Sequence, residues 1–203
     1  MEFREVLARR RMVRAYDGRP VDPAALDRLL AAGLRAPSAG NTQACAFLAV
    51  TGVVPRAALA RVCGERDALA RGLPPWISTA PVLVVPCVRP AAYAERYAER
   101  DKAGSRPPGD RDVPWWWVDA GQALVLLLTA AVDEGLAAGL LDVGDRAGLR
   151  DVLGIPADVV PLGVVTVGHP APDRPSGSLA RGRRPVAEVL HHDRWGTPWR
   201  GAA

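Results

Sequence analysis

RRRMVRAY, residues 9–16, is the segment around which this chain is organised. It places four arginines within six residues, close behind residues 2–8, whose apolar spacing predicts a helix. In a helical turn, Arg10, Arg11 and Arg14 would share one side, because residues three and four apart are neighbours. A guanidinium group is always charged and binds phosphate through paired hydrogen bonds, so the cluster is a candidate anion site. Taken alone, a charge run of this kind more often marks a solvated surface.

The overall composition is that of an ordinary globular protein. Of 203 residues, 49% are hydrophobic and 24% charged, so we expect one domain over residues 1–203 with a single sizeable core. The net charge of +4 is mild, and 25 of the 26 basic residues are arginine, which a GC-rich coding sequence also favours. The chain shows neither a basic stripe with aromatic residues nor a known binding module, so we expect no nucleic-acid partner.

The cysteines and the apolar runs bear on the compartment. Cys45, Cys63 and Cys87 are widely spaced and form no CxxC pair, which is typical of buried thiols in a reducing compartment. The first residues lack the apolar core of a secretory signal. Residues 123–132, the most apolar run, are about half as long as a membrane span requires. We therefore expect a cytoplasmic protein with no membrane partner.

Hydrophobic periodicity predicts a mixed α+β or α/β chain. Asp22 is an N-cap candidate with Pro23 at the first helical position, and Gly154 is a C-terminal stop signal. Residues 135–144 are expected to be irregular, and residues 103–114 to form a turn-rich excursion. The predicted helices cover residues 2–9, 23–34, 56–70, 90–102, 115–134 and 145–153, and the predicted buried strands cover residues 46–51, 81–88 and 159–167.

The usual catalytic motifs are missing from the sequence. No GxGxxG follows a predicted strand, and residues 177–184 imitate a phosphate-binding P-loop only with arginine in place of its lysine and its hydroxyl residue. The three histidines form no HExxH, and the serines have no GxSxG context. We therefore predict no metal site and no catalytic side chain. Arginine clusters without acid–base candidates suit a protein whose cofactor carries the chemistry.

Four segments, in order along the chain, together resemble the signatures of the nitroreductase family of flavoproteins. Residues 10–16 resemble its RR-S-x-R-x-[FY] opening, although Met12 stands where the family usually has serine. Residues 36–43, APSAGNTQ, resemble its APS-x-x-N-x-Q loop. The other two are LGIP at residues 153–156 followed by GHP at 168–170, and RGRRP at 181–185 followed by EV at 188–189 and RW at 194–195.

The resemblance implies an α+β nitroreductase-like fold, with a central, mostly antiparallel sheet flanked by helices. It also implies an intertwined homodimer that binds FMN at the subunit interface, with the tail at residues 185–203 wrapping the partner subunit. A backbone N–H in the loop after residue 140 would bond flavin N5, although residues 135–144 depart from the family wording. The cofactor-binding residues that the resemblance implies are Arg10, Arg11, Met12, Arg14, Pro37, Ser38, Ala39, Asn41, Gln43, Leu141, Asp142, Val143, Arg181 and Arg183.

The activity implied by the resemblance is an FMN-dependent oxidoreductase. NAD(P)H would donate hydride to flavin N5, and a nitroaromatic, a quinone or a similar small molecule would accept the electrons. Two alternatives stay open: a specialised biosynthetic flavin dehydrogenase on the same fold, and a non-enzymatic flavin-binding protein. Three consecutive tryptophans, residues 115–117, either wall the substrate pocket or belong to the core.

Overall fold

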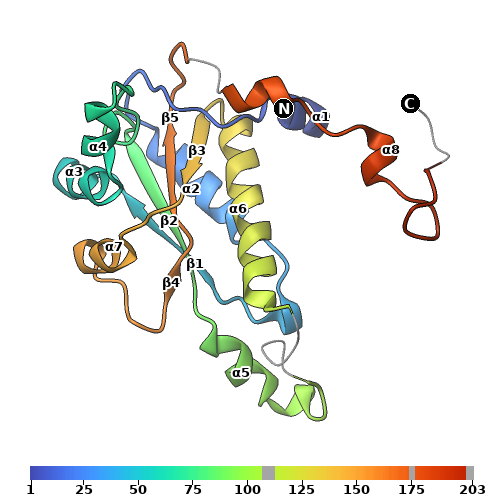
Figure 1. The fold of residues 1–203 in the computed structure, drawn as a ribbon. Coiled ribbons are helices and arrows are strands. Elements are labelled where there is room, and N and C mark those ends of the chain that lie inside the picture. Colours follow the sequence, from blue (N-terminus) through green and yellow to red (C-terminus); the bar gives the residue numbers. More distant parts are fainter. Residues whose placement is uncertain (107–112, 174–176, 200–203) are drawn as a thin grey trace. The chain divides into compact units, whose positions relative to one another are not determined.

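A five-stranded sheet between two helical layers forms the centre of the structure (Figure 1). The structure, a computed structural model, describes residues 1–106, 113–173 and 177–199. It divides into two compact units, Met1–Asp173 and Arg174–Ala203, and the sheet belongs to the first. The expectation of a single domain over residues 1–203 stays a prediction.

Every pair of strands in this sheet is antiparallel. The order is β1-β2-β5-β3, and the short β4 pairs with β2 beside this path. All seven residues of β2 are buried, as its valine-rich sequence predicts for a strand covered on both faces. The mostly antiparallel α+β class is therefore confirmed. The strands are β1 Cys45–Val50, β2 Val82–Val88, β3 Ala137–Leu141, β4 Val160–Pro161 and β5 Val164–Gly168.

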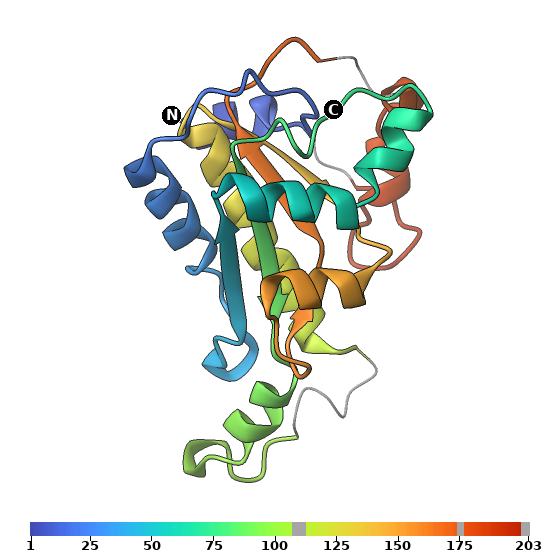
Figure 2. The same cartoon turned by 90° about the vertical axis from the view of Figure 1, so that its left-hand side faces the viewer.

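Helices cover both faces of the sheet, as Figures 1 and 2 show. On one face α2 (Pro23–Gly33) and α6 (Trp115–Asp133) pack together, and Leu29 and Leu127 meet Val84 of β2. On the other face lie α3 (Val53–Val62), α4 (Glu65–Ala70) and α7 (Arg146–Leu153). There Leu59 and Leu149 join the neighbouring Val85 in a second core cluster. Alternate β2 side chains thus serve opposite cores.

Capping residues set the ends of two helices as predicted. Asp22 accepts a hydrogen bond from the backbone N–H of Ala24 at the start of α2, and Asp145 accepts one from Gly148 in α7. Gly154 ends α7 in the left-handed region. The remaining described helices are α1 Phe3–Arg9, η1 Ala39–Asn41, α5 Ala91–Tyr97 and η2 Arg100–Lys102 in the first unit, and η4 Gly177–Arg181 and α8 Val186–Val189 in the second.

Three predicted elements differ from those in the structure. The helix predicted over residues 56–70 is two helices, because Gly64 adopts a φ of 74° between α3 and α4. The passage at residues 135–144, predicted to be irregular, contains β3, whose pairing with β5 overrides a sequence poor in β-branched residues. The strand predicted over residues 159–167 is divided into β4 and β5. Most of the predicted excursion, residues 107–112, lies outside the described residues.

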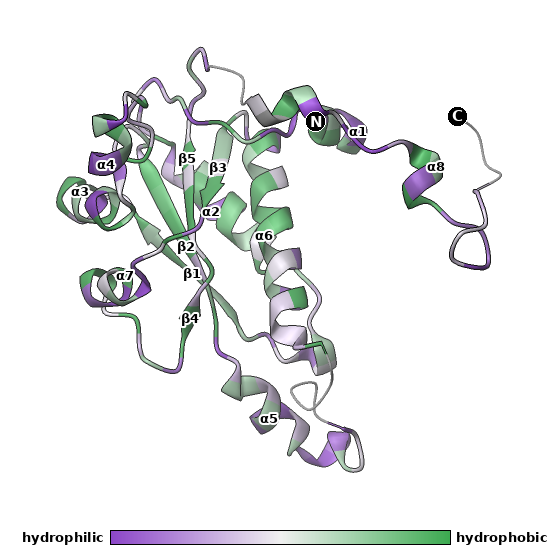
Figure 3. Cartoon of the chain, viewed as in Figure 1, coloured by the Kyte–Doolittle hydropathy of each residue, from purple (hydrophilic) through white to green (hydrophobic). Residues whose placement is uncertain are grey.

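Helix α6 runs the length of the sheet and, in Figure 3, is most hydrophobic over its C-terminal half. Its 19 residues are long and apolar enough to cross a membrane by length and composition. Here, however, α6 packs against α2, β2 and β3, which is the arrangement of a core helix. A cytoplasmic location stays a prediction.

Candidate functional site

After Arg9, the arginine segment (residues 9–14) runs in extended backbone against the edge strand β3. Helix α1 ends at Arg9, and Met12 forms a parallel bridge with Ala138. The backbone N–H of Val13 donates to the carbonyl of Ala138 at 3.0 Å. Val13 is buried while Met12 and Arg14 are exposed, as the alternation of an extended chain requires. The segment is thus presented by strand-like contacts and not by a helical turn.

A glycine and a tyrosine make this close approach possible. A Cβ on Gly139 would lie 2.4 Å from the carbonyl oxygen of Val13, so β3 accepts the segment only with glycine at this position. The buried hydroxyl of Tyr16 shares a hydrogen bond with Thr166 Oγ1 at 2.6 Å and donates to the Val13 carbonyl at 3.0 Å. Burial raises the pKa of Tyr16 above its ordinary value.

The arginines differ in what they contact. Arg9 forms an ion pair with Glu5 along α1, and Arg11 Nη1 lies 3.7 Å from the carboxylate of Asp173. The guanidinium of Arg14 lies over the ring of Trp76, with Cζ 5.6 Å from the ring centroid. Within residues 1–106, 113–173 and 177–199, the side chains of Arg10 and Arg14 form no ion pair with a carboxylate. They therefore keep their charge available for an anionic ligand.

Residues 141–143 follow the far end of the same strand. Asp142 Oδ1 accepts hydrogen bonds from the backbone N–H of Val143 and from Arg146 Nη2, both at 2.9 Å. From Ala138 to Asp142 is four strand residues, or about 13 Å. The structure thus brings the arginine segment and the predicted N5 loop to one edge of the sheet, and a ligand about that long can reach both.

The amide loop, residues 36–43, is held by a carboxylate from α6. Asp119, 2% exposed, accepts the backbone N–H of Ala39 at 2.8 Å and the hydroxyl of Tyr93 at 2.6 Å, both on Oδ2. Burial, and then the hydrogen bond to Asp119, raises the pKa of Tyr93 above its ordinary value. A buried carboxylate is costly unless it is hydrogen-bonded, so this contact fixes the loop to the helix.

Hydrogen bonds also fix the shape of the amide loop. Asn41 and Gln43 adopt φ values of 56° and 54°, which side-chain-bearing residues rarely adopt. The backbone N–H of Gln43 donates to Ser38 Oγ at 2.9 Å, and Arg96 Nε of α5 donates to the Gly40 carbonyl at 2.9 Å. The exposed side chains of Asn41 and Gln43 therefore project from a preformed backbone.

The two parts of the predicted site lie at opposite ends of α6 (Figure 1). The amide loop contacts Asp119, near the start of α6. The N-terminal amine, which precedes α1, donates to Asp133, the last residue of α6, at 2.8 Å. Fourteen helical residues separate these anchors, which corresponds to about 21 Å. The first unit of one chain thus does not bring Pro37, Ser38, Ala39, Asn41 or Gln43 near the arginine segment.

The C-terminal arginines belong to the second unit. Arg181 is the last residue of η4, Arg183 follows Gly182, and both are exposed. Arg184 forms an ion pair with Glu188 at 3.2 Å in α8. The role of Arg181 and Arg183 as phosphate ligands stays a prediction, as does the wrapping of the tail around a partner.

Sequence reasoning did not find Trp76 or Asp119 as site residues. Trp76 comes before a strand in the run Pro74-Pro75-Trp76, and only its spatial contact with Arg14 marks it. Asp119 left a usable signal, because an acidic residue early in an otherwise apolar helix requires buried partners. Among the described residues, no group of His, Cys, Asp and Glu is arranged to hold a metal ion.

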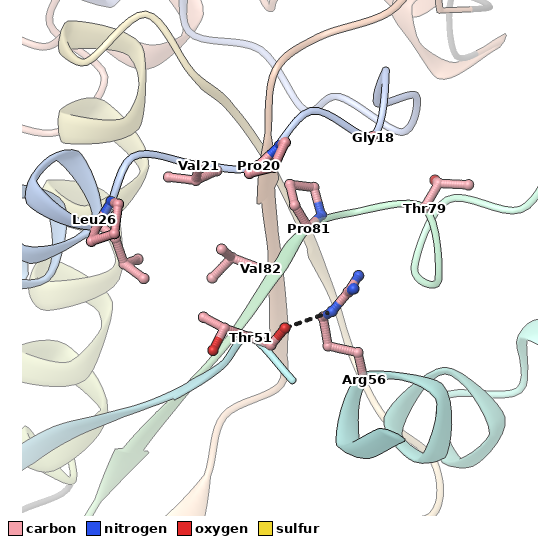
Figure 4. A pocket seen from close by; sticks show the side chains of 10 residues that line it. Gly18, Pro20, Val21, Leu26, Thr51, Arg56, Thr79, Pro81 and Val82 are labelled. Atoms are coloured by element: carbon pink, nitrogen blue, oxygen red, sulfur yellow. Dashed lines mark hydrogen bonds between the residues drawn. The ribbon is translucent and has the colours of Figure 1, made fainter. Parts of the chain in front are cut away.

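A cavity of about 450 Å³ lies elsewhere, between the start of α2 and the ends of β1 and β2 (Figure 4). Pro20, Val21 and Leu26 line it, together with Arg56 of α3. Arg56 donates to the Thr51 carbonyl at 3.1 Å and to the Ala80 carbonyl at 2.6 Å, so its guanidinium joins the chain after β1 to the chain before β2. None of the sequence-predicted site residues lines this cavity.

Comparison with known proteins points to one family, whose members share this fold. Residues 7–169 match the family model described as the Nitroreductase family. An FMN reductase (NAD(P)H) of Bacillus subtilis is 30% identical over 190 residues, which cover 90% of this chain and 70% of that protein. A hypothetical oxidoreductase from Bacillus subtilis has a similar structure, with a TM-score of 0.74, 25% identity, and coverage of 96% and 74% of the two chains. A nitroreductase family protein from Streptococcus pneumoniae shares the fold, with a TM-score of 0.72, 21% identity, and coverage of 94% and 100%.

Proposed function

The chain belongs to the nitroreductase family of oxidoreductases, and we propose that it works as an FMN-dependent homodimer. In this proposal NAD(P)H is the reductant, and a nitroaromatic, a quinone or a similar small molecule is the electron acceptor. The observation that carries the proposal is that the two groups of residues predicted to bind FMN are separated within one chain. The arginine segment and the amide loop are each preformed, yet they lie at opposite ends of α6.

A second copy of the chain supplies the missing half. In a two-fold dimer, the same patches are used on both subunits, so the amide loop of one chain meets the arginine segment of the other twice over. Each flavin site then contains the arginine segment and residues 141–143 of one subunit and residues 37–43 of its partner. In one chain each half lines only a small pocket, of about 190 Å³ beside Arg11 and about 150 Å³ beside Ser38 and Gln43.

The free side of α6 supports such a dimer. Val118, Gly121, Val125 and Leu126, spaced as one helical face, line an open apolar groove of about 670 Å³. Val125 is 55% exposed, although it lies in the longest apolar helix of the described chain. The side-chain oxygen of Gln122 beside them is buried and has no hydrogen-bond partner among the described residues. A partner subunit would cover these apolar side chains.

The side chains present fit FMN in their chemistry. Arg10 and Arg14 offer guanidinium donors to the phosphate, with Arg11, Arg181 and Arg183 as further candidates, and each charge-assisted contact is worth about 1.5–3 kcal/mol. Asn41 and Gln43 present amide donors and acceptors that suit the ribityl chain or the ring edge.

The protein's own contribution is to hold and orient. When bound, FMN supplies the redox chemistry, taking a hydride from NAD(P)H and passing the electrons to the acceptor. Asp119 keeps the amide loop in place through the Ala39 N–H, and β3 keeps the arginine segment extended. In the loop at residues 141–143, a backbone N–H other than that of Val143, which donates to Asp142, would orient the reacting edge of the ring.

Absorbance spectroscopy of the purified protein tests the proposal. We expect a yellow protein with a flavin spectrum that bleaches on addition of NADH or NADPH and recovers with a nitroaromatic or quinone. A colourless protein that takes up no FMN would contradict the proposal. A bound flavin that neither nucleotide reduces would instead favour a specialised biosynthetic dehydrogenase. A flavin that is reduced by no donor and oxidised by no acceptor would favour a binding protein.

A further inference from the structure

A buried carboxylate outside the predicted site shapes the loop that follows α4. Glu65, the first residue of that helix, is only 5% exposed. Its Oε1 accepts the backbone N–H groups of Trp76, Ile77 and Ser78 at 2.9, 2.7 and 3.1 Å. Three consecutive amide donors on one carboxylate oxygen satisfy a charge that would otherwise be costly to bury. These three hydrogen bonds therefore fix the backbone of residues 76–78 to the start of α4.

The side chain presented by this loop lies between strand β3 and an arginine. The Trp76 side chain packs against the core cluster that contains Leu59 of α3 and Leu149 of α7. A Cβ added to Gly139 would lie 3.1 Å from the Trp76 ring. On its other side, the Arg14 guanidinium lies 5.6 Å from the ring centroid. The backbone of Arg14 is held separately, because its N–H donates to Asp173 Oδ2 at 2.9 Å. Both ends of this arginine are thus restrained.

Stacking of this kind leaves the edge of the guanidinium free. The aromatic face attracts the cation, while the N–H groups in the guanidinium plane remain able to donate to another group. Within the described parts of the chain, no carboxylate forms an ion pair with the Arg14 side chain. A restrained and unpaired cation at the edge of β3 is preorganised for an anionic ligand.

We propose that Trp76, fixed by Glu65, is a positioning residue that holds the Arg14 guanidinium toward an acceptor oxygen of the bound flavin. The inference rests on the proposed function and adds a role for residues outside the resemblance to the family. The oxygen belongs either to the phosphate or to the carbonyl edge of the ring. Trp76 acts only through Arg14, so its contribution should vanish when Arg14 is replaced.

A double-mutant cycle on the dissociation constant of FMN tests this dependence. The protein is stripped of flavin and titrated with FMN, with quenching of flavin fluorescence as the readout. Trp76→Leu should weaken FMN binding about two- to fivefold, the range of a partly exposed cation–π contact. In an Arg14→Gln background, the same Trp76→Leu change should leave the dissociation constant unchanged. Trp76→Phe, which keeps an aromatic face, should lose less than Trp76→Leu.

Two further measurements separate positioning from a general loss of stability. Leu59→Ala is a matched control, because Leu59 is fully buried in the same core cluster and its aliphatic side chain can neither stack on Arg14 as an aromatic ring does nor hydrogen-bond to it. It should lower the melting temperature without changing FMN affinity. Repeating the cycle with riboflavin, which lacks the phosphate, identifies the oxygen: an effect that disappears assigns the phosphate, and one that persists assigns the ring edge.

The outcomes that overturn the inference are distinct from failure of the proposed function. Equal losses from Trp76→Leu in both backgrounds, or no loss in either, would refute the positioning role while FMN still binds the unmodified protein. Failure of the unmodified protein to bind FMN would overturn the proposed function and this inference together.

Discussion

At the scale of single residues, the arginine segment is a set of unequal cations. Arg9 lies on α1 and pairs with Glu5, whereas Arg14 lies on extended backbone beside β3 with its side chain stacked on Trp76. The sequence shows the four arginines only as one cluster. Their different roles follow from the point at which α1 ends and the extended backbone begins.

Replacement of Arg14 should therefore matter more than replacement of Arg9. Arg14→Ala removes a preorganised, unpaired donor and should weaken FMN binding about 10- to 100-fold, as expected for a charge-assisted contact. Arg9→Ala removes an exposed ion pair within a helix and should change the affinity less than about twofold. Fluorescence titration of both variants measures the difference, and equal affinities would refute the assignment.

Much of the arginine segment's surroundings was not predictable from the sequence. Residues 10–14 stand out by charge, but Arg14 contacts Trp76 from about 60 residues away in the chain, and Trp76 is in turn held by Glu65. Gly139 has no local signature that distinguishes a close backbone approach from an ordinary loop glycine. Local patterns identify which residues carry chemistry, and tertiary contacts decide which of them are restrained.

At the scale of elements, the helices were predicted better than the strands. The capped helices α2 and α7 have apolar periodicity and clear end signals, and α6 stands out as a long apolar stretch, so the bounds of all three were confirmed to within a residue or two. Strand β3 was missed because Ala-Ala-Gly-Leu-Leu has low strand propensity, and only its pairing with β5 makes it a strand. The amide loop was located by motif, whereas its attachment to α6 was not.

The attachment of the amide loop to α6 depends on Asp119. Asp119→Ala leaves the buried Tyr93 hydroxyl and the Ala39 N–H without their acceptor. We expect the free energy of unfolding to fall by about 2–4 kcal/mol, the cost of two unsatisfied buried donors. FMN affinity should fall as well, because the loop loses its anchor.

Tyr93→Phe is the matched control for this substitution. It removes the hydroxyl but keeps the Asp119–Ala39 contact, so it should cost only about 1 kcal/mol and leave FMN binding intact. Urea denaturation and flavin titration of both variants give the two readouts. Indistinguishable FMN affinities for the Asp119 variant and the unmodified protein would show that the anchor is irrelevant to the site.

At the scale of the whole molecule, buried phenols and thiols make stability depend on alkaline pH. Burial raises the pKa of Tyr16 and of Tyr93, and it raises the pKa of Cys63 to about 12. Above their ordinary pKa values, these groups lose protons in the unfolded chain and keep them in the folded one. Stability is therefore complete below about pH 9 and falls as pH rises beyond it.

The share of Tyr16 in this decline is measurable. At about pH 11 its burial alone should lower the free energy of unfolding by about 1.4 kcal/mol, or about 3–6 °C in melting temperature. Tyr16→Phe should show a shallower decline above pH 10 than the unmodified protein, whatever its stability at neutral pH. Melting curves across this range provide the test, and parallel declines in the two proteins would contradict it.

At this scale we propose a flavin site shared between two chains. In one chain the arginine segment and the amide loop are anchored at opposite ends of α6. Two variants probe this directly: Arg14→Ala damages the first half, and Asn41→Ala with Gln43→Ala damages the second. In either homodimer, both sites should be impaired.

Mixing the two damaged chains is the most direct test. Differently tagged variants are unfolded together, refolded and purified as the mixed dimer, which is then titrated with FMN. If the site is shared, one of the two sites combines the intact arginine segment of one chain with the intact amide loop of the other. We therefore expect half of the sites to regain the affinity of the unmodified protein. A mixed dimer in which no site regains that affinity would contradict the shared site.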